Sequence, residues 1–215
     1  MLKIKRAHSE LLRDEVYSLR YKAYRSESAI EKSPSESFKD EYDDQPNHIL
    51  WALTEDEKVV GSIRTTWYEP SLDYTIPEMK SYGEDIARTI PPETRLLSGN
   101  RFVTDPTRAI RSAHYVMLLL RHYMVVAAIK CDWAVCAVRL NHLPFYRRVL
   151  RLERASEGRI YPGLTCSMNL MVCDFRKNID KVYEANPILR PHGYERVLLD
   201  ENYQDIWELG LPLEG

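Results

Sequence analysis

The segment Ala113–Ile129, near the middle of the chain, is apolar on almost every side. A helix over about Arg111–Lys130 with this composition has no polar face to present to water, so it belongs inside a core or a membrane. The segment is slightly short for a membrane span and contains His114, Arg121 and His122. We therefore expect a buried central helix with layers of other elements packed around it.

Short segments rich in β-branched and aromatic residues predict the sheet against which that helix packs. They are Lys3–Ala7, His48–Leu53, Lys58–Tyr68, Arg95–Thr104, Trp133–Val138 and Thr165–Asp174. The short polar segment Thr54–Glu57 joins the second and third of them as a hairpin.

Helical periodicity predicts further helices between these strands. They are expected from Ser9, a suitable N-cap, to about Arg25, near Tyr82–Thr89, over Leu143–Arg154 and, as a short helix, beyond Arg176. The order is strand, helix, three antiparallel strands, helix, strand, helix, strand. This order predicts a mixed α/β layer fold.

A chain of 215 residues fits one domain, which we expect over residues 1–175, with 176–215 as a C-terminal extension that packs on it or frays. The formal net charge of −2 gives no bias toward nucleic acid or anionic lipid. The start of the chain, Met1–Lys5, has no apolar run of signal-peptide length, so we expect a cytoplasmic protein.

The cysteines do not form a metal-binding pattern. Cys131, Cys136, Cys166 and Cys173 lie in two apolar, strand-like runs, and none forms a CxxC pair or has a histidine at ligand spacing. We interpret them as small reduced core residues and expect no metal site.

Two aspartates and two arginines are the main candidates for a functional site. Asp40 and Asp43 lie in an acidic segment before the hairpin, which taken alone fits a solvated loop. Arg64 and Arg101 lie on predicted strands between apolar residues, and a buried arginine needs a partner. We therefore expect an arginine–aspartate network that is either structural or holds a substrate.

Four short motifs occur in the order found in the autoinducer (acyl-homoserine lactone) synthases and the related long-chain N-acyl amino acid synthases. They are Arg20-x3-Tyr24, Asp40-x-x-Asp43, Gly61-Ser62-Ile63-Arg64 and Ser98-Gly99-Asn100-Arg101-Phe102. The chain resembles these families over about residues 15–175. The resemblance implies the GNAT (acyl-CoA N-acyltransferase) fold, an α/β (α+β) fold in which a twisted, mixed and mostly antiparallel sheet carries helices on both faces.

Three positions depart from the autoinducer-synthase pattern. Tyr24 stands where these synthases have phenylalanine, Ile30 where they have tryptophan, and Ser98 where they have glutamate. The last two departures favour N-acyl amino acid synthesis over homoserine-lactone synthesis, which stays as the alternative.

The resemblance implies that the chain is an enzyme that transfers an acyl group from a thioester to the amine of an amino acid or related small molecule. Under it, the catalytic candidates are Arg101, Asp43 and Asp40, and the substrate-binding candidates are Arg20, Tyr24, Arg64, Ser98, Phe102 and Val103. The two strand arginines would clamp a carboxylate, while the aspartates would orient the amine or fix the arginines. A backbone N–H of the 101–104 strand would polarise the carbonyl, in a V-shaped opening between the strands at 95–104 and 133–138.

The segment that matches the GNAT phosphate loop, residues 103–112, has no glycine. Arg108 and Arg111 could bind phosphate there through their side chains. The predicted helix Leu143–Arg154 carries Arg147, Arg148, Arg151 and Arg154, which suits an acidic acyl carrier protein and equally fits a solvated helix face. We expect an acyl carrier protein as partner, bound through Arg108, Arg111, Arg147 and Arg151. The expected donor is an acyl-phosphopantetheine thioester, on that carrier or on coenzyme A, with no tightly bound cofactor.

Two other interpretations stay open. An ordinary acetyl-coenzyme A acetyltransferase shares the fold, and the missing glycine loop argues against it. A non-catalytic acyl- or amino-acid-binding module is compatible with the lack of an obvious histidine or glutamate base.

Overall fold

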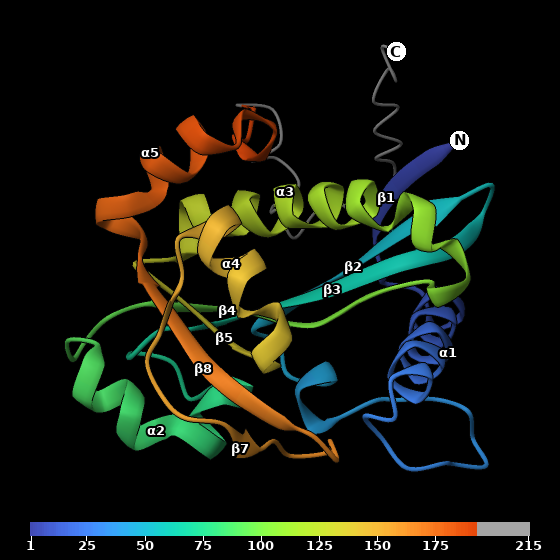
Figure 1. Ribbon diagram of the computed structural model, residues 1–215, viewed down its shortest axis with the longest axis horizontal. Helices are drawn as coiled ribbons and strands as arrows, with labels where there is room; N and C mark the ends of the chain where they lie inside the picture. Colours follow the sequence, from blue (N-terminus) through green and yellow to red (C-terminus); the bar gives the residue numbers. More distant parts are fainter. Residues whose placement is uncertain (193–215) are drawn as a thin grey trace.

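In the computed structural model, which describes residues 1–192, eight strands form one open sheet (Figure 1). The strand order is β1-β2-β3-β4-β5-β8-β6, and β7 also pairs with β8. The strands are β1 (Leu2–Arg6), β2 (His48–Glu55), β3 (Lys58–Tyr68), β4 (Leu96–Thr104), β5 (Trp133–Val138), β6 (Glu153–Arg154), β7 (Arg159–Ile160) and β8 (Ser167–Asp174). The pairing of β4 with β5 is parallel and the other pairings are antiparallel, so the predicted mixed, mostly antiparallel sheet is confirmed.

Helices cover both faces of this sheet because neighbouring strand residues point to opposite sides. The helices are α1 (Glu10–Ser26), α2 (Pro77–Thr89), α3 (Ser112–Lys130), α4 (Leu143–Leu150) and α5 (Phe175–Ala185). Leu97 and Ala134 pack in the cluster that contains α3, α4 and α5, whereas Leu96 and Val135 pack in the cluster that contains α2. A third cluster joins α1 to β2. The two-sided burial of the sheet is that of an α/β layer fold.

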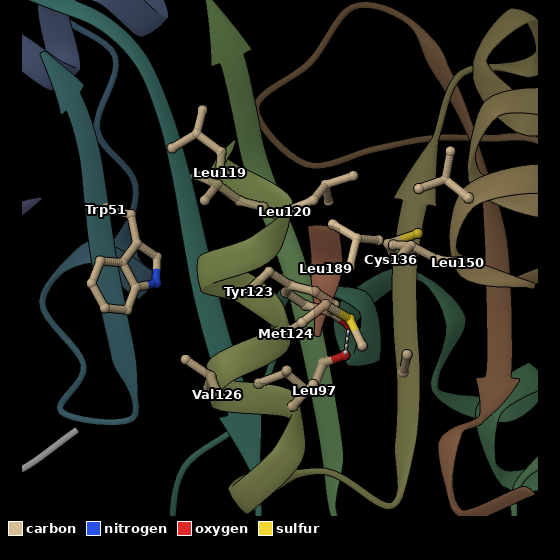
Figure 2. Packing of buried hydrophobic residues seen from close by; sticks show 14 of the residues in the cluster. Trp51, Leu97, Leu119, Leu120, Tyr123, Met124, Val126, Cys136, Leu150 and Leu189 are labelled. Atoms are coloured by element: carbon tan, nitrogen blue, oxygen red, sulfur yellow. Dashed lines mark hydrogen bonds between the residues drawn. The ribbon is translucent and has the colours of Figure 1, made fainter. Parts of the chain in front are cut away.

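The central helix α3 is buried, as its composition predicts. Its residues from Leu118 to Ala127 are nearly inaccessible to solvent. Figure 2 shows Leu119, Tyr123 and Met124 packed between the strands and the other helices, with the Tyr123 hydroxyl donating to the Leu97 carbonyl at 3.4 Å. Within the described residues, Pro106–Lys130 is long and apolar enough to cross a membrane, but 61% of its most apolar window is buried inside the protein.

The strands β4 and β5 separate partway along their length. They pair from Leu96–Trp133 to Ser98–Val135, and the pairing then stops. On the other side of β4, a register shift opposite Ser62–Arg64 marks a bulge, where Arg101 adopts a left-handed backbone with a φ of 50°. The V-shaped opening predicted between these strands is therefore confirmed, and the bulge bends β4 beside it.

The predicted helix Leu143–Arg154 is wrong in its second half. Helix α4 ends at Leu150 because Arg151 adopts a left-handed conformation, with φ 58° and ψ 24°, and closes the helix. Glu153 and Arg154 then pair with β8 as a short strand. Of the four arginines expected on one helix, only Arg147 and Arg148 lie on it.

Other boundaries lie close to the prediction. Ser9 caps α1 by accepting a hydrogen bond from the Leu12 amide at 3.3 Å. Helix α2 begins five residues before the predicted Tyr82, at Pro77, and is kinked at Tyr82. Helix α5 and the 3-10 turn Pro187–Leu189 pack against α3. The rest of the predicted C-terminal extension, residues 193–215, lies outside the described residues.

Candidate active site

A cavity of about 580 Å³ occupies the opening between β4 and β5. One wall is the bulged part of β4, from Gly99 to Thr104, and the opposite wall is the end of β5 with the start of α4. Helix α1 contributes Tyr24, and the segment after β4 contributes Asp105, Pro106, Ala109 and Ser112. The cavity is therefore built where the parallel pair of strands parts, which leaves backbone and side chains of β4 accessible to a ligand.

A buried cluster of charges lies behind the β4 wall, and it joins four elements. Arg20 on α1 donates through Nη1 to both carboxylate oxygens of Asp43, at 2.9 and 2.8 Å, and neither side chain is accessible to solvent. Asp43 also caps the turn that holds it by accepting from the Asp40 amide at 3.1 Å. The predicted acidic pair is thus a structured capping turn rather than a solvated loop.

Arg64 on β3 is the centre of the cluster. Its Nη1 contacts Asp40 at 2.5 Å and Asp43 at 3.0 Å, its Nη2 donates to Asp40 at 3.1 Å, and its Nε donates to Asn100 at 2.6 Å. The side chain is fully buried and does not line the cavity. Arg64 therefore lies one layer behind the wall and connects the acidic turn to β4.

Arg101 is the arginine of the cluster that reaches the cavity wall. Its Nε and Nη2 contact Asp40 at 2.7 and 2.6 Å, and its guanidinium stacks over the Phe38 ring at 4.6 Å and lies 5.8 Å from the Tyr24 ring. Its Nη1 makes no hydrogen bond within residues 1–192. Arg101 is thus held in place on one side and has donor capacity left on the other.

The cluster carries one uncompensated positive charge. It contains three arginines (Arg20, Arg64 and Arg101) and two aspartates (Asp40 and Asp43), whose side chains are at most 18% exposed. Burial alone would raise the pKa of both aspartates, but the arginines hold the pKa of each carboxyl below its usual range. Both aspartates are therefore ionised at neutral pH, and arginine stays protonated throughout.

Several site residues were not found from the sequence. Asn100 on β4 lines the cavity, accepts from Arg64 and donates to the Ser98 hydroxyl at 2.9 Å, which places the predicted Ser98 next to the cluster but fully buried. Arg139 and His142 line the other wall, and Arg139 pairs with Glu27 across the mouth at 2.9 Å. The position of Arg139 directly after a buried strand, beside a predicted opening, was a signal that could have indicated it.

The two arginines of the glycine-free segment do not face the cavity. Arg108 and Arg111 both pair with Glu55 at the end of β2, and the Tyr115 hydroxyl donates to the same carboxylate at 3.1 Å. The segment contributes Pro106, Ala109 and Ser112 to the cavity instead. The other predicted carrier-binding residues, Arg147 and Arg151, are exposed, and Arg147 pairs with Glu153 at 3.1 Å.

The remaining predicted substrate-binding residues belong to the cavity wall. Tyr24, Phe102 and Val103 line the cavity. The rest of the lining includes the apolar and aromatic residues Val116, Val138, Phe145, Tyr146 and Met168. Within residues 1–192 no group of three histidine, cysteine or acidic side chains could hold a metal ion, and the four cysteines are free thiols. The site therefore combines a cationic end with an apolar interior.

Comparison with known proteins places the chain in a family. A model of the family described as N-acyl amino acid synthase FeeM matches residues 15–174. Comparison with curated proteins gave no match.

Three solved structures with similar folds are 11–16% identical to the chain. FeeM, an N-acyl amino acid synthase from uncultured soil microbes, is 14% identical with a TM-score of 0.67, over 86% of this chain and 97% of that one. MesI, a CoA-dependent acyl-homoserine lactone synthase, is 16% identical with a TM-score of 0.55, over 87% and 95%. An acyl-CoA N-acyltransferase from Pseudomonas aeruginosa is 11% identical with a TM-score of 0.53, over 80% and 97%. These likenesses show the GNAT fold.

Proposed function

Because this chain belongs to the FeeM family of N-acyl amino acid synthases and is an N-acyltransferase, we propose that it joins a fatty acyl group to the amine of an amino acid. The acyl donor in this proposal is a thioester on an acyl carrier protein. The observation that carries the proposal is the excess positive charge of the buried cluster next to a cavity with an apolar interior.

The acceptor binds through its carboxylate. A buried excess charge is costly unless an opposite charge neutralises it, so an anion that enters the cavity gains more here than in water. Arg101 makes the contact, since it lines the cavity and its Nη1 is unengaged within residues 1–192. Arg64, Asp40 and Asp43 act behind it by fixing its position and the position of Asn100.

The geometry of β4 supports acyl transfer to an amine. The reaction needs a neutral amine, a polarised thioester carbonyl and a short distance between them. The bulge at Arg101 and Phe102 interrupts the pairing with β3, so backbone N–H groups of this part of β4 can donate to a carbonyl oxygen in the cavity. The amine attacks the carbonyl carbon, the carbon–sulfur bond breaks, and the thiolate takes the proton that the nitrogen loses.

The acyl chain extends into the apolar part of the cavity. Val116 from α3 and Phe145 and Tyr146 from α4 line this part, and a smaller void continues from it toward Leu120 and Leu150 in the core. Apolar lining removes the chain from water at a gain of about 0.8 kcal/mol per buried methylene. A long chain is therefore a better donor than an acetyl group.

The carrier protein docks over the mouth of the cavity. Arg147, Arg148 and Arg151 are exposed near one side, Ile110 and Leu140 are exposed apolar residues near the mouth, and Arg111 lies beside Ile110. An acidic partner with an apolar patch complements this surface. MesI is described as CoA-dependent, so coenzyme A stays as the alternative donor.

Mass spectrometry of lipid extracts from cells that overproduce the protein tests the proposal. We expect N-acyl amino acids in these extracts and much less of them in extracts from cells that produce the Arg101→Met variant. Steady-state kinetics of the purified enzyme with one acyl chain on carrier protein and on coenzyme A then identify the donor. An equal or higher kcat/KM with coenzyme A would exclude the carrier as the preferred donor, and no acyl product with either would exclude the proposed reaction.

A further inference from the structure

Glu78 is a buried carboxyl group that none of the sequence motifs includes. It lies in the first turn of α2 and is inaccessible to solvent. The Tyr161 hydroxyl donates to its Oε1 at 3.4 Å, while its Oε2 has no hydrogen-bond partner within residues 1–192. A buried carboxylate oxygen without a partner is costly, so this group needs a reason to be there.

A chain of hydrogen bonds leads from the arginine cluster to Glu78. Arg64 can only donate, so the Asn100 atom that faces it is the carbonyl Oδ1, and Asn100 Nδ2 donates to Ser98 Oγ at 2.9 Å. The Ser98 hydroxyl has then accepted a bond, and its own proton is left to donate. The Ser98 hydroxyl lies close enough to the Glu78 carboxyl to oppose the rise in the Glu78 pKa, although Glu78 Oε2 has no hydrogen-bond partner within residues 1–192.

The net charge of the arginine cluster explains why a connection to Glu78 matters. The cluster of Arg20, Arg64, Arg101, Asp40 and Asp43 has one excess positive charge. An ionised Glu78 would bring the total to zero, and so would the carboxylate of a bound acceptor. Both together would leave one buried negative charge, which is as costly as the positive one.

The titratable groups around Glu78 are neutral at pH 7, which leaves the Glu78 carboxyl as the group whose charge can change. Burial raises its pKa above the ordinary 4.5, and the Ser98 hydroxyl and Arg64 oppose that rise. The other titratable groups that face it are Tyr42, Tyr82, Tyr123, Cys136 and Tyr161. Burial raises the pKa of every one of these, so they are neutral at pH 7. His48, which faces Arg64, has a pKa lowered by burial and is neutral as well.

We propose that Glu78 is the alternative counter-ion of the arginine cluster, and that binding of the acceptor carboxylate is coupled to uptake of one proton by Glu78. This inference rests on the proposed function and names how its acceptor site is regulated. Glu78 is a positioning residue, because it acts on the substrate through Ser98, Asn100 and Arg64 and does not line the cavity.

Protonation of Glu78 favours binding of the acceptor carboxylate. When Glu78 is protonated, the cluster is cationic and binds a carboxylate well. When pH rises through the raised pKa of Glu78, the cluster becomes neutral and the carboxylate binds less tightly. A coupling of one pKa unit between the two sites corresponds to about a tenfold change in affinity. The dissociation constant begins to rise at the Glu78 pKa of the free enzyme, which lies above the ordinary 4.5, and levels off at the higher Glu78 pKa of the complex.

The reaction product is the suitable probe because it keeps the carboxylate and has no amine that titrates. Titration calorimetry with the N-octanoyl derivatives of alanine, leucine and phenylalanine measures the dissociation constant from pH 5 to pH 9. We expect it to rise about tenfold for the wild type. The dissociation constant of Glu78→Gln should stay, up to pH 9, within about twofold of the value that this variant has at pH 5. Glu84 is an exposed glutamate on the same helix, and the dissociation constant of Glu84→Gln should rise as it does for the wild type.

Two measurements keep the inference falsifiable if Glu78→Gln folds poorly. Wild-type protein in buffers of different ionisation enthalpy should take up about half a proton per bound product at the pH of maximum uptake, and N-octanoyl-alaninamide, which lacks the carboxylate, should bind without uptake. Binding of the carboxylates with neither pH dependence nor proton uptake would overturn this inference and leave the proposed function intact. No binding of any of them at pH 5 would overturn both.

Discussion

The cluster behind the cavity predicts that its more exposed member matters more for stability than its most buried one. Asp40 is 18% exposed and Arg64 is fully buried. Asp40, however, serves two arginines through four contacts of 2.5–3.1 Å. In Asp40→Asn, the cluster keeps three arginines and one aspartate, and its net charge rises from one to two. The substitution keeps the cap, because asparagine is as good a helix cap as the aspartate that now caps the Tyr42 amide. Its amide nitrogen replaces an acceptor oxygen with a donor, so the loss of charge and the loss of hydrogen bonds to the arginines act together.

Arg64→Met has the opposite effect on the charge. Asp43 keeps both contacts with Arg20, and Asp40 keeps both contacts with Arg101, so the cluster becomes neutral. The main loss is the partner of Asn100 Oδ1, which costs about 1–3 kcal/mol for a buried acceptor. Leaving a buried charge without its partner, as in Asp40→Asn, costs about 3–5 kcal/mol.

Thermal and urea unfolding measure the difference. In a chain of this size, a loss of 1 kcal/mol lowers Tm by about 2–4 °C. At a pH at which Glu78 is protonated, we therefore expect Asp40→Asn to lower Tm by about 6–20 °C and Arg64→Met by about 2–12 °C. Asp44→Asn, which removes an exposed acid in the same segment, should leave Tm nearly unchanged. If Arg64→Met proved the less stable variant, burial would outweigh charge balance and the count of one excess charge would be refuted.

Three further outcomes are expected. Arg101→Met should lower kcat/KM for an amino acid acceptor by about 30- to 150-fold and have little effect with the corresponding amino acid amide; an equal loss with both acceptors would contradict the carboxylate contact. Arg147→Glu combined with Arg151→Glu should raise KM for the acyl carrier protein at low salt and leave KM for acyl-coenzyme A unchanged, whereas an unchanged carrier KM would place the dock elsewhere. The pKa values of Asp40 and Asp43 are lower in the folded than in the unfolded chain, so the stability that these aspartates contribute above pH about 4 should fall as the pH drops below that value. Urea unfolding between pH 3 and pH 7 should show this loss of stability, and the loss should be smaller in Asp40→Asn.

The fold was predictable where composition alone forces an outcome. A segment as apolar as α3 can be stable only when it is covered, and the run Trp133–Val138 between charged residues became β5 with the predicted bounds. The arginine–aspartate network was predictable for the same reason, since a strand arginine among apolar residues needs an acid. The end of α4 was not predictable, because Arg151 takes the left-handed position that glycine usually occupies.

The parts of the site that escaped prediction depend on contacts between distant segments. Glu78 lies in a proline-rich excursion and has the composition of a surface residue, and only the packing of α2 against the sheet buries it beside Ser98. The predicted phosphate contacts of Arg108 and Arg111 depended on what else lay near them. Their partner, Glu55, is at a hairpin turn more than fifty residues earlier, at a place where an exposed acid is the normal expectation.

The left-handed backbone conformation of Arg101 favours a function for its side chain. Its φ of 50° is a conformation that costs a residue with a side chain about 1–2 kcal/mol, and glycine would adopt it without that cost. An arginine is kept there, and its guanidinium is fixed by Asp40 and by the Phe38 ring with one nitrogen left unengaged within residues 1–192. The bulge that produces this conformation also interrupts the pairing of β4 at the cavity wall. In the proposed function, the same local distortion directs the cation toward the acceptor carboxylate and leaves backbone donors for the carbonyl, so binding and chemistry would depend on one feature of one strand.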